Sequence, residues 1–293
     1  MSSFISYLIG GISLGSIYAL IALGYTMVYG IAKMLNFAHG DVIMIGGYIS
    51  WLVLSGLGLP VWLAILCAIV VCIILGVVVE KVAYKPLRTA TPLAVLITAI
   101  GVSYLLQNVA LLTFGPASKT YDSVVPDSVG LKLGAIDVTG ETIITIIATI
   151  VIMISLTLFV NHTKSGKAML AVSEDKGAAQ LMGINVNRTI SLTFAIGSAL
   201  AAVAGILMCS TYPQIGPYTG AMPGIKAFTA AVFGGIGSIP GAMIGGVVLG
   251  IIENLSKAYI SSQLSDAIVF AVLIIVLLVK PTGLLGKKIS EKV

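Results

Sequence analysis

Charged side chains are scarce in this sequence of 293 residues: only 9% are Asp, Glu, Lys or Arg, while 58% are hydrophobic. A soluble domain carries about 25% charged residues, because its surface must be wetted by water. This composition excludes a soluble domain and a disordered chain, and it indicates an all-α polytopic membrane protein. The net charge of +5 does not point to nucleic acid, because the topology of a membrane protein is enough to explain it.

The chain also lacks the motifs of common catalytic, nucleotide and metal sites. No segment matches G-x-x-x-x-G-K-[ST], H-E-x-x-H or C-x-x-C, and His39 and His162 both fall at predicted helix ends. The predicted spans are nearly free of ionisable side chains, because Asp41, Glu253 and Asp266 each lie near a predicted end. An intramembrane enzyme or a proton-coupled carrier needs such groups inside the bilayer. We therefore expect no enzyme, no catalytic residue, no metal site and no cofactor bound by this chain.

Charge, glycine and proline divide the chain into about eight apolar segments, which we expect to form a single transmembrane domain over residues 1–293. The segments are 4–32, 38–55, 60–80, 92–115, 141–161, 189–212, 225–252 and 264–280. Between Phe233 and Gly241 the seventh segment contains four glycines and a proline. We expect a helical hairpin there, 225–235 and 240–254, with one continuous helix as the alternative.

Lys and Arg in short loops mark the cytoplasmic side of a membrane protein. The loop 116–140, on the opposite predicted face, carries Asp122, Asp127 and Asp137. We therefore expect the N-terminus outside and the C-terminus in the cytoplasm. The basic residues on the predicted cytoplasmic face are Lys33, Lys81, Lys85, Arg88, Lys164, Lys167, Lys176, Arg188, Lys280, Lys287, Lys288 and Lys292.

The largest predicted cytoplasmic loop, 162–188, contains a segment that we expect to form one short helix. Ser173 is a suitable N-cap, and Glu174 and Asp175 would lie in the first turn, where the helix dipole favours negative charge. Gly183 would provide a left-handed C-terminal cap.

One face of this predicted helix carries mostly small side chains, at spacings near 3.6 residues: Ala171, Ala178, Ala179 and Met182. Such a face suits the groove of a partner protein. A surface helix lying along the lipid headgroups is equally compatible with these residues.

A second polar segment, from Asn36 to Asp41, lies between two long apolar segments. In one interpretation Asn36 caps the second helix and Asp41 lies in its first turn. In the other interpretation, these polar groups face the cytoplasmic exit of a pore.

Three parts of the chain resemble the LivH-type permeases of branched-chain amino acid ABC importers. The segments Gly15 to Gly24, Val28 to Gly30 and Asn36 to Gly40 resemble the opening of these permeases. The segment from Glu174 to Ile184 resembles their coupling loop, and the segment from Gly234 to Gly241 resembles their late glycine loop. The motifs follow the family's order over nearly the whole chain, although Gly177 departs from the usual Glu or Ala. The Asn-Phe-Ala-His-Gly motif also occurs in related permeases for urea.

The resemblance implies a type II ABC importer permease in the inner membrane of a prokaryotic cell. Its partners would be two ATPase subunits that use ATP and Mg²⁺, a second, different permease chain and an external solute-binding protein. The residues expected to couple to the ATPases are Glu174, Asp175, Ala178, Ala179, Leu181, Met182 and Gly183. The residues expected to shape the translocation path are Asn36, Phe37, His39, Gly40, Gly234, Gly235, Gly237 and Ser238.

The expected function is import of branched-chain amino acids, because a path lined by small and neutral polar groups suits an aliphatic zwitterion. Three alternatives stay open at this point. One is an ABC importer for urea or another amide. The second is a sodium-coupled carrier, whose ion could bind backbone carbonyls at the glycine break. The third is a membrane scaffold or receptor that transports nothing.

Overall fold

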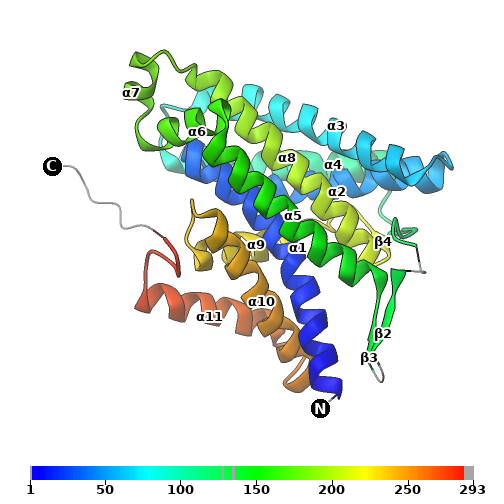
Figure 1. Cartoon of the computed structure of the whole chain (residues 1–293). Helices are drawn as coiled ribbons and strands as arrows, with labels where there is room; N and C mark the ends of the chain where they lie inside the picture. Colours follow the sequence, from blue (N-terminus) through cyan, green and yellow to red (C-terminus); the bar gives the residue numbers. More distant parts are fainter. Residues whose placement is uncertain (1, 127–128, 134–135, 287–293) are drawn as a thin grey trace.

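The computed structural model describes residues 2–126, 129–133 and 136–286 as a bundle of helices (Figure 1). Each of the eight predicted apolar segments forms helix, and the seventh forms two helices. Six helices of the described residues are long and apolar enough to cross a membrane. The helical elements are α1 (Ser2–Ala32), α2 (His39–Trp51), η1 (Leu52–Gly56), α3 (Val61–Val79), η2 (Glu80–Tyr84), η3 (Lys85–Leu87), α4 (Pro92–Phe114), α5 (Gly140–His162), α6 (Lys164–Glu174), α7 (Lys176–Leu181), α8 (Val186–Thr211), α9 (Ala221–Gly234), α10 (Ile239–Tyr259) and α11 (Ser265–Val279).

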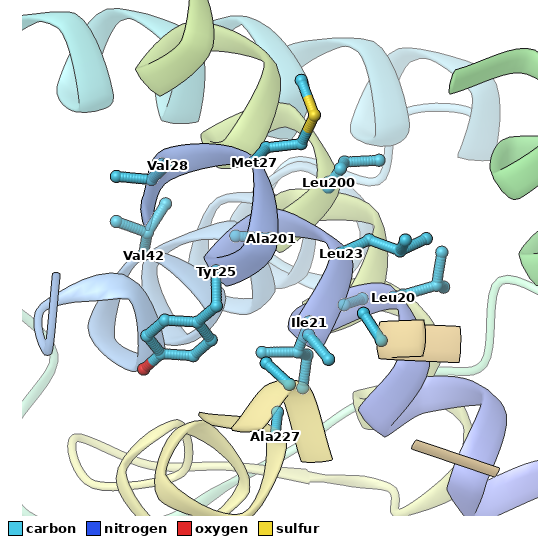
Figure 2. Packing of buried hydrophobic residues seen from close by; sticks show 14 of the residues in the cluster. Leu20, Ile21, Leu23, Tyr25, Met27, Val28, Val42, Leu200, Ala201 and Ala227 are labelled. Carbon is cyan, nitrogen blue, oxygen red and sulfur yellow. The ribbon is translucent and has the colours of Figure 1, made fainter. Parts of the chain in front are cut away.

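Helix α1 is the central element of the bundle. Its residues Ile17 and Ala19 are fully buried although they lie on opposite sides of the helix, as a helix surrounded by protein requires. Helices α5, α8, α9 and α10 all contact α1. Figure 2 shows side chains of α1 packed against Val42 of α2, Leu200 of α8 and Ala227 of α9. The core therefore forms around α1.

Glycines allow α1 and α10 to lie unusually close together. A Cβ atom added to Gly15 would lie 2.6 Å from the Cα atom of Val247, and one added to Gly11 would lie 2.8 Å from that of Ile251. Real Cβ atoms do not approach backbone so closely. The small residues of α1 thus serve helix packing, as they commonly do in membrane proteins.

Helix α2 begins inside the bundle, beside the second half of α1, and not at the end of the bundle. Helix α1 ends at Ala32, and the chain reverses at Lys33, whose φ angle is +59°. Residues 33–38 then lead back, so that the ring of His39, the first residue of α2, lies 4.7 Å from the ring of Tyr25. Since Tyr25 precedes the end of α1 by seven residues, about 10 Å of helix, α2 begins well inside the bundle.

The glycine break forms the predicted hairpin, so the alternative of one continuous helix is wrong. Helix α9 ends at Gly234, and α10 begins at Ile239. Between them Gly235 and Gly237 have φ angles of +102° and +94°, a region that glycine reaches without strain. Both helices are longer than expected: α9 begins at Ala221 and α10 continues to Tyr259.

The two ends of the bundle carry different structures. Strands β2 (Leu131–Leu133) and β3 (Ile136–Val138) form a hairpin near the beginning of α1, whereas α6 and α7 lie at the opposite end (Figure 1). Strand β1 (Lys119–Thr120) pairs with β4 (Gln214–Ile215). The loops predicted to lie on opposite membrane faces are thus at opposite ends. Among the charges used to predict orientation, Asp127, Lys287, Lys288 and Lys292 lie outside the described residues.

Candidate functional site

The predicted coupling helix is two helices, α6 and α7, separated by Asp175. The expectation that Ser173 begins the helix is wrong, because Ser173 lies inside α6 and its hydroxyl donates to the carbonyl of Leu170 (2.7 Å). Asp175 is the N-cap of α7 instead. Its Oδ1 atom accepts hydrogen bonds from the amides of Gly177 (2.7 Å) and Ala178 (3.0 Å). The carboxylate therefore satisfies two amides that the first turn of α7 leaves unpaired.

The predicted left-handed cap at Gly183 is confirmed. Gly183 has a φ angle of +83°, and its amide donates to the carbonyl of Gln180 (3.0 Å). The next amide, that of Ile184, donates to the carbonyl of Ala179 (3.0 Å). These two bonds are the Schellman pattern, which closes a helix and turns the chain away from it.

Two large apolar side chains are exposed at the C-terminal end of α7. Leu181 is 91% exposed and Met182 is 82% exposed, whereas Ala179 is only 3% exposed. Ala179 therefore packs against its own protein, and the expected small-residue face is not turned outward at this position. The ammonium group of Lys176 donates to the carbonyl of Ala32 (3.0 Å) and connects α7 to the end of α1.

The Asp175 cap leads to a prediction about α7. We expect Asp175→Ala to destabilise α7 by about 1 kcal/mol, because the Gly177 and Ala178 amides lose their acceptor. Amide exchange of these two residues, measured by hydrogen exchange with mass spectrometry, should become about fivefold faster. Ser173→Ala is the matched control, since this hydroxyl bonds within α6. Faster exchange in the control alone would place the cap at Ser173.

Two polar residues of the segment from Asn36 to Asp41 form hydrogen bonds with side chains of other helices. The N-cap of α2 is Ala38, so the interpretation in which Asn36 caps this helix is wrong. The Oδ1 atom of Asn36 accepts a hydrogen bond from the hydroxyl of Tyr84 (2.9 Å). Asp41 does lie in the first turn of α2, and it accepts a hydrogen bond from Gln107 of α4 (2.9 Å).

Aromatic rings connect the start of α2 to α9. The ring of Phe37 lies 5.4 Å from that of Phe228, and the ring of Tyr25 lies 5.7 Å from that of Phe228. His39 is only 1% exposed, and Asn36 and Gly40 are also buried. In this conformation these three residues face neighbouring helices, while Phe37 is partly exposed.

The glycine loop between α9 and α10 lies against the last turn of α1. A Cβ atom added to Gly30 would lie 3.3 Å from the Cα atom of Gly237. The hydroxyl of Ser238 caps α10 by accepting from the amide of Gly241 (3.2 Å), and the carbonyl of Gly234 accepts from the amide of Leu285 (2.9 Å). The structure thus brings both groups of predicted path residues to the second half of α1.

A buried cluster of charges near the middle of α1 was not expected from the sequence. Glu253 is 1% exposed and accepts hydrogen bonds from Lys226 (2.8 Å), Lys257 (2.6 Å) and the hydroxyl of Tyr18 (2.8 Å). Lys226 also pairs with Asp266 (2.6 Å). Because Tyr18 is central in α1 and α10 continues past Glu253, the expectation that Glu253 lies at a helix end is wrong.

The buried cluster changes one argument about function. The scarcity of ionisable groups inside the spans was the reason to disfavour an enzyme and a proton-coupled carrier. Lys226, which opens the glycine-broken segment, was the signal that could have revealed the cluster, because an ionisable residue at membrane depth requires a partner. The class of protein must therefore be decided by other observations.

The family model described as the permease component of branched-chain amino acid transport systems matches residues 7–277. The chain belongs to this family. The permease is 48% identical to the LivH protein of the high-affinity branched-chain amino acid transport system of Escherichia coli K12, with 99% of this chain and 98% of LivH aligned. It is 43% identical to BraD of Pseudomonas aeruginosa, again over 99% of this chain and 98% of BraD. The autoinducer 2 permease LsrD of Salmonella paratyphi B is 27% identical over 93% of this chain and 82% of LsrD.

These comparisons decide the class of protein. A multi-pass membrane permease accounts for the spanning helices, and its relatives are transport subunits. Nearly complete alignment with LivH and BraD includes α6, α7 and the glycine hairpin, so the candidate elements lie in parts of the chain shared with these relatives.

Proposed function

We propose that this chain is the membrane-spanning permease of an ATP-driven importer that moves branched-chain amino acids into the cell. The observation that carries the proposal is 48% identity with LivH over almost the full length of both chains. BraD, a permease of the same kind of system, is similar over the same extent. The similarity to LsrD, an autoinducer 2 permease, is much lower, which favours an amino acid over a solute of that kind.

In the proposed importer, this chain leaves ATP hydrolysis to other subunits. Its sequence contains no G-x-x-x-x-G-K-[ST] motif. Two ATPase subunits would bind ATP and Mg²⁺ on the cytoplasmic side, and a solute-binding protein would deliver the amino acid from outside. A second, different permease of the same family would complete the path. The proposed location is the membrane of a prokaryotic cell, and the proposed orientation, with the N-terminus outside and the C-terminus in the cytoplasm, follows the positive-inside rule.

The loop 162–188 is the proposed coupling element. Leu181 and Met182 project from α7, at the end of the bundle opposite the β2–β3 hairpin (Figure 1). Two large, exposed apolar side chains at the tip of a short helix suit a groove on a partner protein. Around them are the other exposed residues of the proposed contact, Glu174, Asp175, Ala178 and Gly183.

A movement of α7 would be transmitted to the translocation path through two contacts between α7 and the bundle. The bond from Lys176 to the carbonyl of Ala32 connects α7 to the end of α1, and buried Ala179 fixes α7 against the bundle. The segment Asn36 to Gly40 and the glycine loop, with Gly234, Gly235, Gly237 and Ser238, border the same half of α1. We propose that these two segments move when the path changes its access. Weak contacts with a zwitterion would then favour its release.

The experiment that tests this function replaces both exposed apolar residues of α7. In cells with the native partners, we expect Leu181→Asp with Met182→Asp to lower uptake of radiolabelled leucine at least about tenfold, because the acids cannot enter an apolar groove. ATPase subunits that co-purify with the tagged permease, identified by mass spectrometry, should be lost in parallel.

Leu131→Asp is the matched control for this experiment. Leu131 is also apolar and exposed, at 57%, but it lies in β2 at the opposite end of the bundle. The control should keep both uptake and ATPase subunits. If the purified chain alone carried leucine in vesicles without ATP, and required sodium, the importer would be ruled out in favour of a secondary carrier.

A further inference from the structure

A small cavity lies where the end of α1, the segment after α3 and the beginning of α7 meet. Its volume is about 240 Å³. Three of its lining residues are cations that come from these three separate parts of the chain: Lys33, Arg88 and Lys176. The fold therefore brings together charges that are more than fifty residues apart in sequence.

The cavity has an excess of positive charge. Arg88 pairs with buried Glu80 and also donates to Asn187, so this guanidinium is held in place and its charge is balanced. Neither Lys33 nor Lys176 forms an ion pair within residues 2–126, 129–133 and 136–286. Burial, followed by the charges of Arg88 and Lys33, lowers the pKa of Lys176.

Asp175 and Lys176 both form hydrogen bonds with backbone groups. The Asp175 carboxylate is directed at the amides of Gly177 and Ala178 in α7. Within the part of the chain that the structure describes, the Lys176 ammonium donates to the carbonyl of Ala32, a neutral acceptor. Two lysines beside one cavity are an unfavourable arrangement unless an anion lies between them.

The other side of the cavity is apolar and continues into a surface suited to lipid. Met34, Leu87 and Val95 line the cavity together with Pro92, the first residue of α4. Beyond Pro92, α4 presents exposed apolar side chains, including Leu93 at 65% and Ile97 at 60% exposure. A cationic recess at the end of an apolar helix surface matches a molecule with an anionic head and a hydrocarbon tail.

We propose that this cavity binds the phosphate group of an anionic phospholipid, held by Lys33 and Lys176, with the acyl chains lying along α4. The side chain of Arg88, held by Glu80 and Asn187, forms a fixed wall behind the phosphate. Because Lys176 is the first residue of α7, the bound lipid would also stabilise the position of this helix at the membrane surface. The proposal does not depend on which solute the permease transports.

Lipid binding by the purified permease in neutral detergent tests the proposal. Dioleoyl-phosphatidylglycerol and dioleoyl-phosphatidylcholine are added separately, and bound lipid is counted by native mass spectrometry. We expect the wild-type permease to prefer phosphatidylglycerol. Replacing both lysines, as Lys33→Asn with Lys176→Gln, should weaken this binding about 10- to 30-fold, as the loss of two charges near a phosphate predicts. Asn is chosen at position 33 because it tolerates the positive φ angle.

The control variant replaces Lys85, a lysine of the same segment as Arg88. Lys85 is exposed, precedes Arg88 by three residues and is absent from the cavity wall, so Lys85→Gln should retain wild-type binding. If the double variant fails to fold, Lys33→Asn alone should weaken binding about fivefold. Equal loss with Lys85→Gln, unchanged binding in the lysine variants, or full competition by equimolar inorganic phosphate would each overturn the proposal.

Discussion

Gly15→Leu is expected to prevent the permease from reaching its folded state. The new side chain would have to pass through the backbone of α10, since even a Cβ atom on Gly15 lies 2.6 Å from the Cα atom and 2.7 Å from the carbonyl oxygen of Val247. Overpacking a core by a few methylene groups costs about 1–3 kcal/mol, and here the obstacle is rigid backbone. The expected result is loss of the monodisperse peak when a fluorescently tagged variant is analysed by size-exclusion chromatography in detergent.

Gly101→Leu is the matched control for the packing of α1 and α10. Gly101 lies in α4, and a Cβ atom at this position would meet no heavy atom within 4 Å. The same substitution in another spanning helix should therefore leave the chromatographic peak intact and change stability by about 0.5 kcal/mol or less. Equal damage at both positions would mean that added bulk in the membrane, and not contact between α1 and α10, limits folding.

The positions of the apolar segments could be predicted because their signals are local. A run of apolar residues must be about 20 residues long to cross the bilayer, and glycine or proline interrupts such a run wherever it occurs. The break between Phe233 and Gly241 was recognised from these residues alone, and α9 and α10 form the expected hairpin. The signal for the left-handed cap at Gly183 was also local, since the cap depends on this glycine and on the amides of Gly183 and Ile184.

The roles of polar residues were harder to predict, because their partners lie far along the chain. Asn36 is a good helix cap by composition, but the hydroxyl of Tyr84 holds its side chain, and α2 begins at His39 inside the bundle. Ser173 and Asp175 have nearly equal capping ability. Asp175 is the cap because the backbone leaves the helical conformation there, with φ −154° and ψ 114°, whereas Ser173 lies inside α6.

Lys226 shows why the buried cluster of charges was not predicted from the sequence. A charged residue beside an apolar run was taken to mark the end of a span, which is correct when the residue reaches water. Lys226 instead lies inside the bundle, where Glu253 of α10 and Asp266 of α11 compensate its charge. These partners are 27 and 40 residues further along the chain, so no local pattern connects them.

Breaking this buried cluster is expected to have the second large effect. Lys226→Met removes the ammonium group that lies 2.8 Å from Glu253, a carboxylate that is only 1% exposed. Removal of one partner of a buried ion pair costs about 3–5 kcal/mol when the remaining charge stays desolvated. We expect a loss at the lower end of this range, because Lys257 and Tyr18 still donate hydrogen bonds to Glu253. Glu253→Gln should cost a similar amount, since Lys226 is then left with the half-exposed Asp266. Unfolding of each purified variant in mixed detergent micelles of increasing SDS content measures these losses.

The double variant, Lys226→Met with Glu253→Gln, distinguishes pairing from simple packing. If the two charges stabilise each other, the second substitution removes the charge that has lost its buried partner in the first, and the double variant is then more stable than the sum of the single losses predicts. Lys257→Met is the control, because Lys257 contacts the same carboxylate but is 38% exposed; solvent screening reduces its expected effect to about 0–1 kcal/mol. Additive losses in the double variant would contradict the ion pair and would mean that Lys226 stabilises the bundle mainly through Asp266.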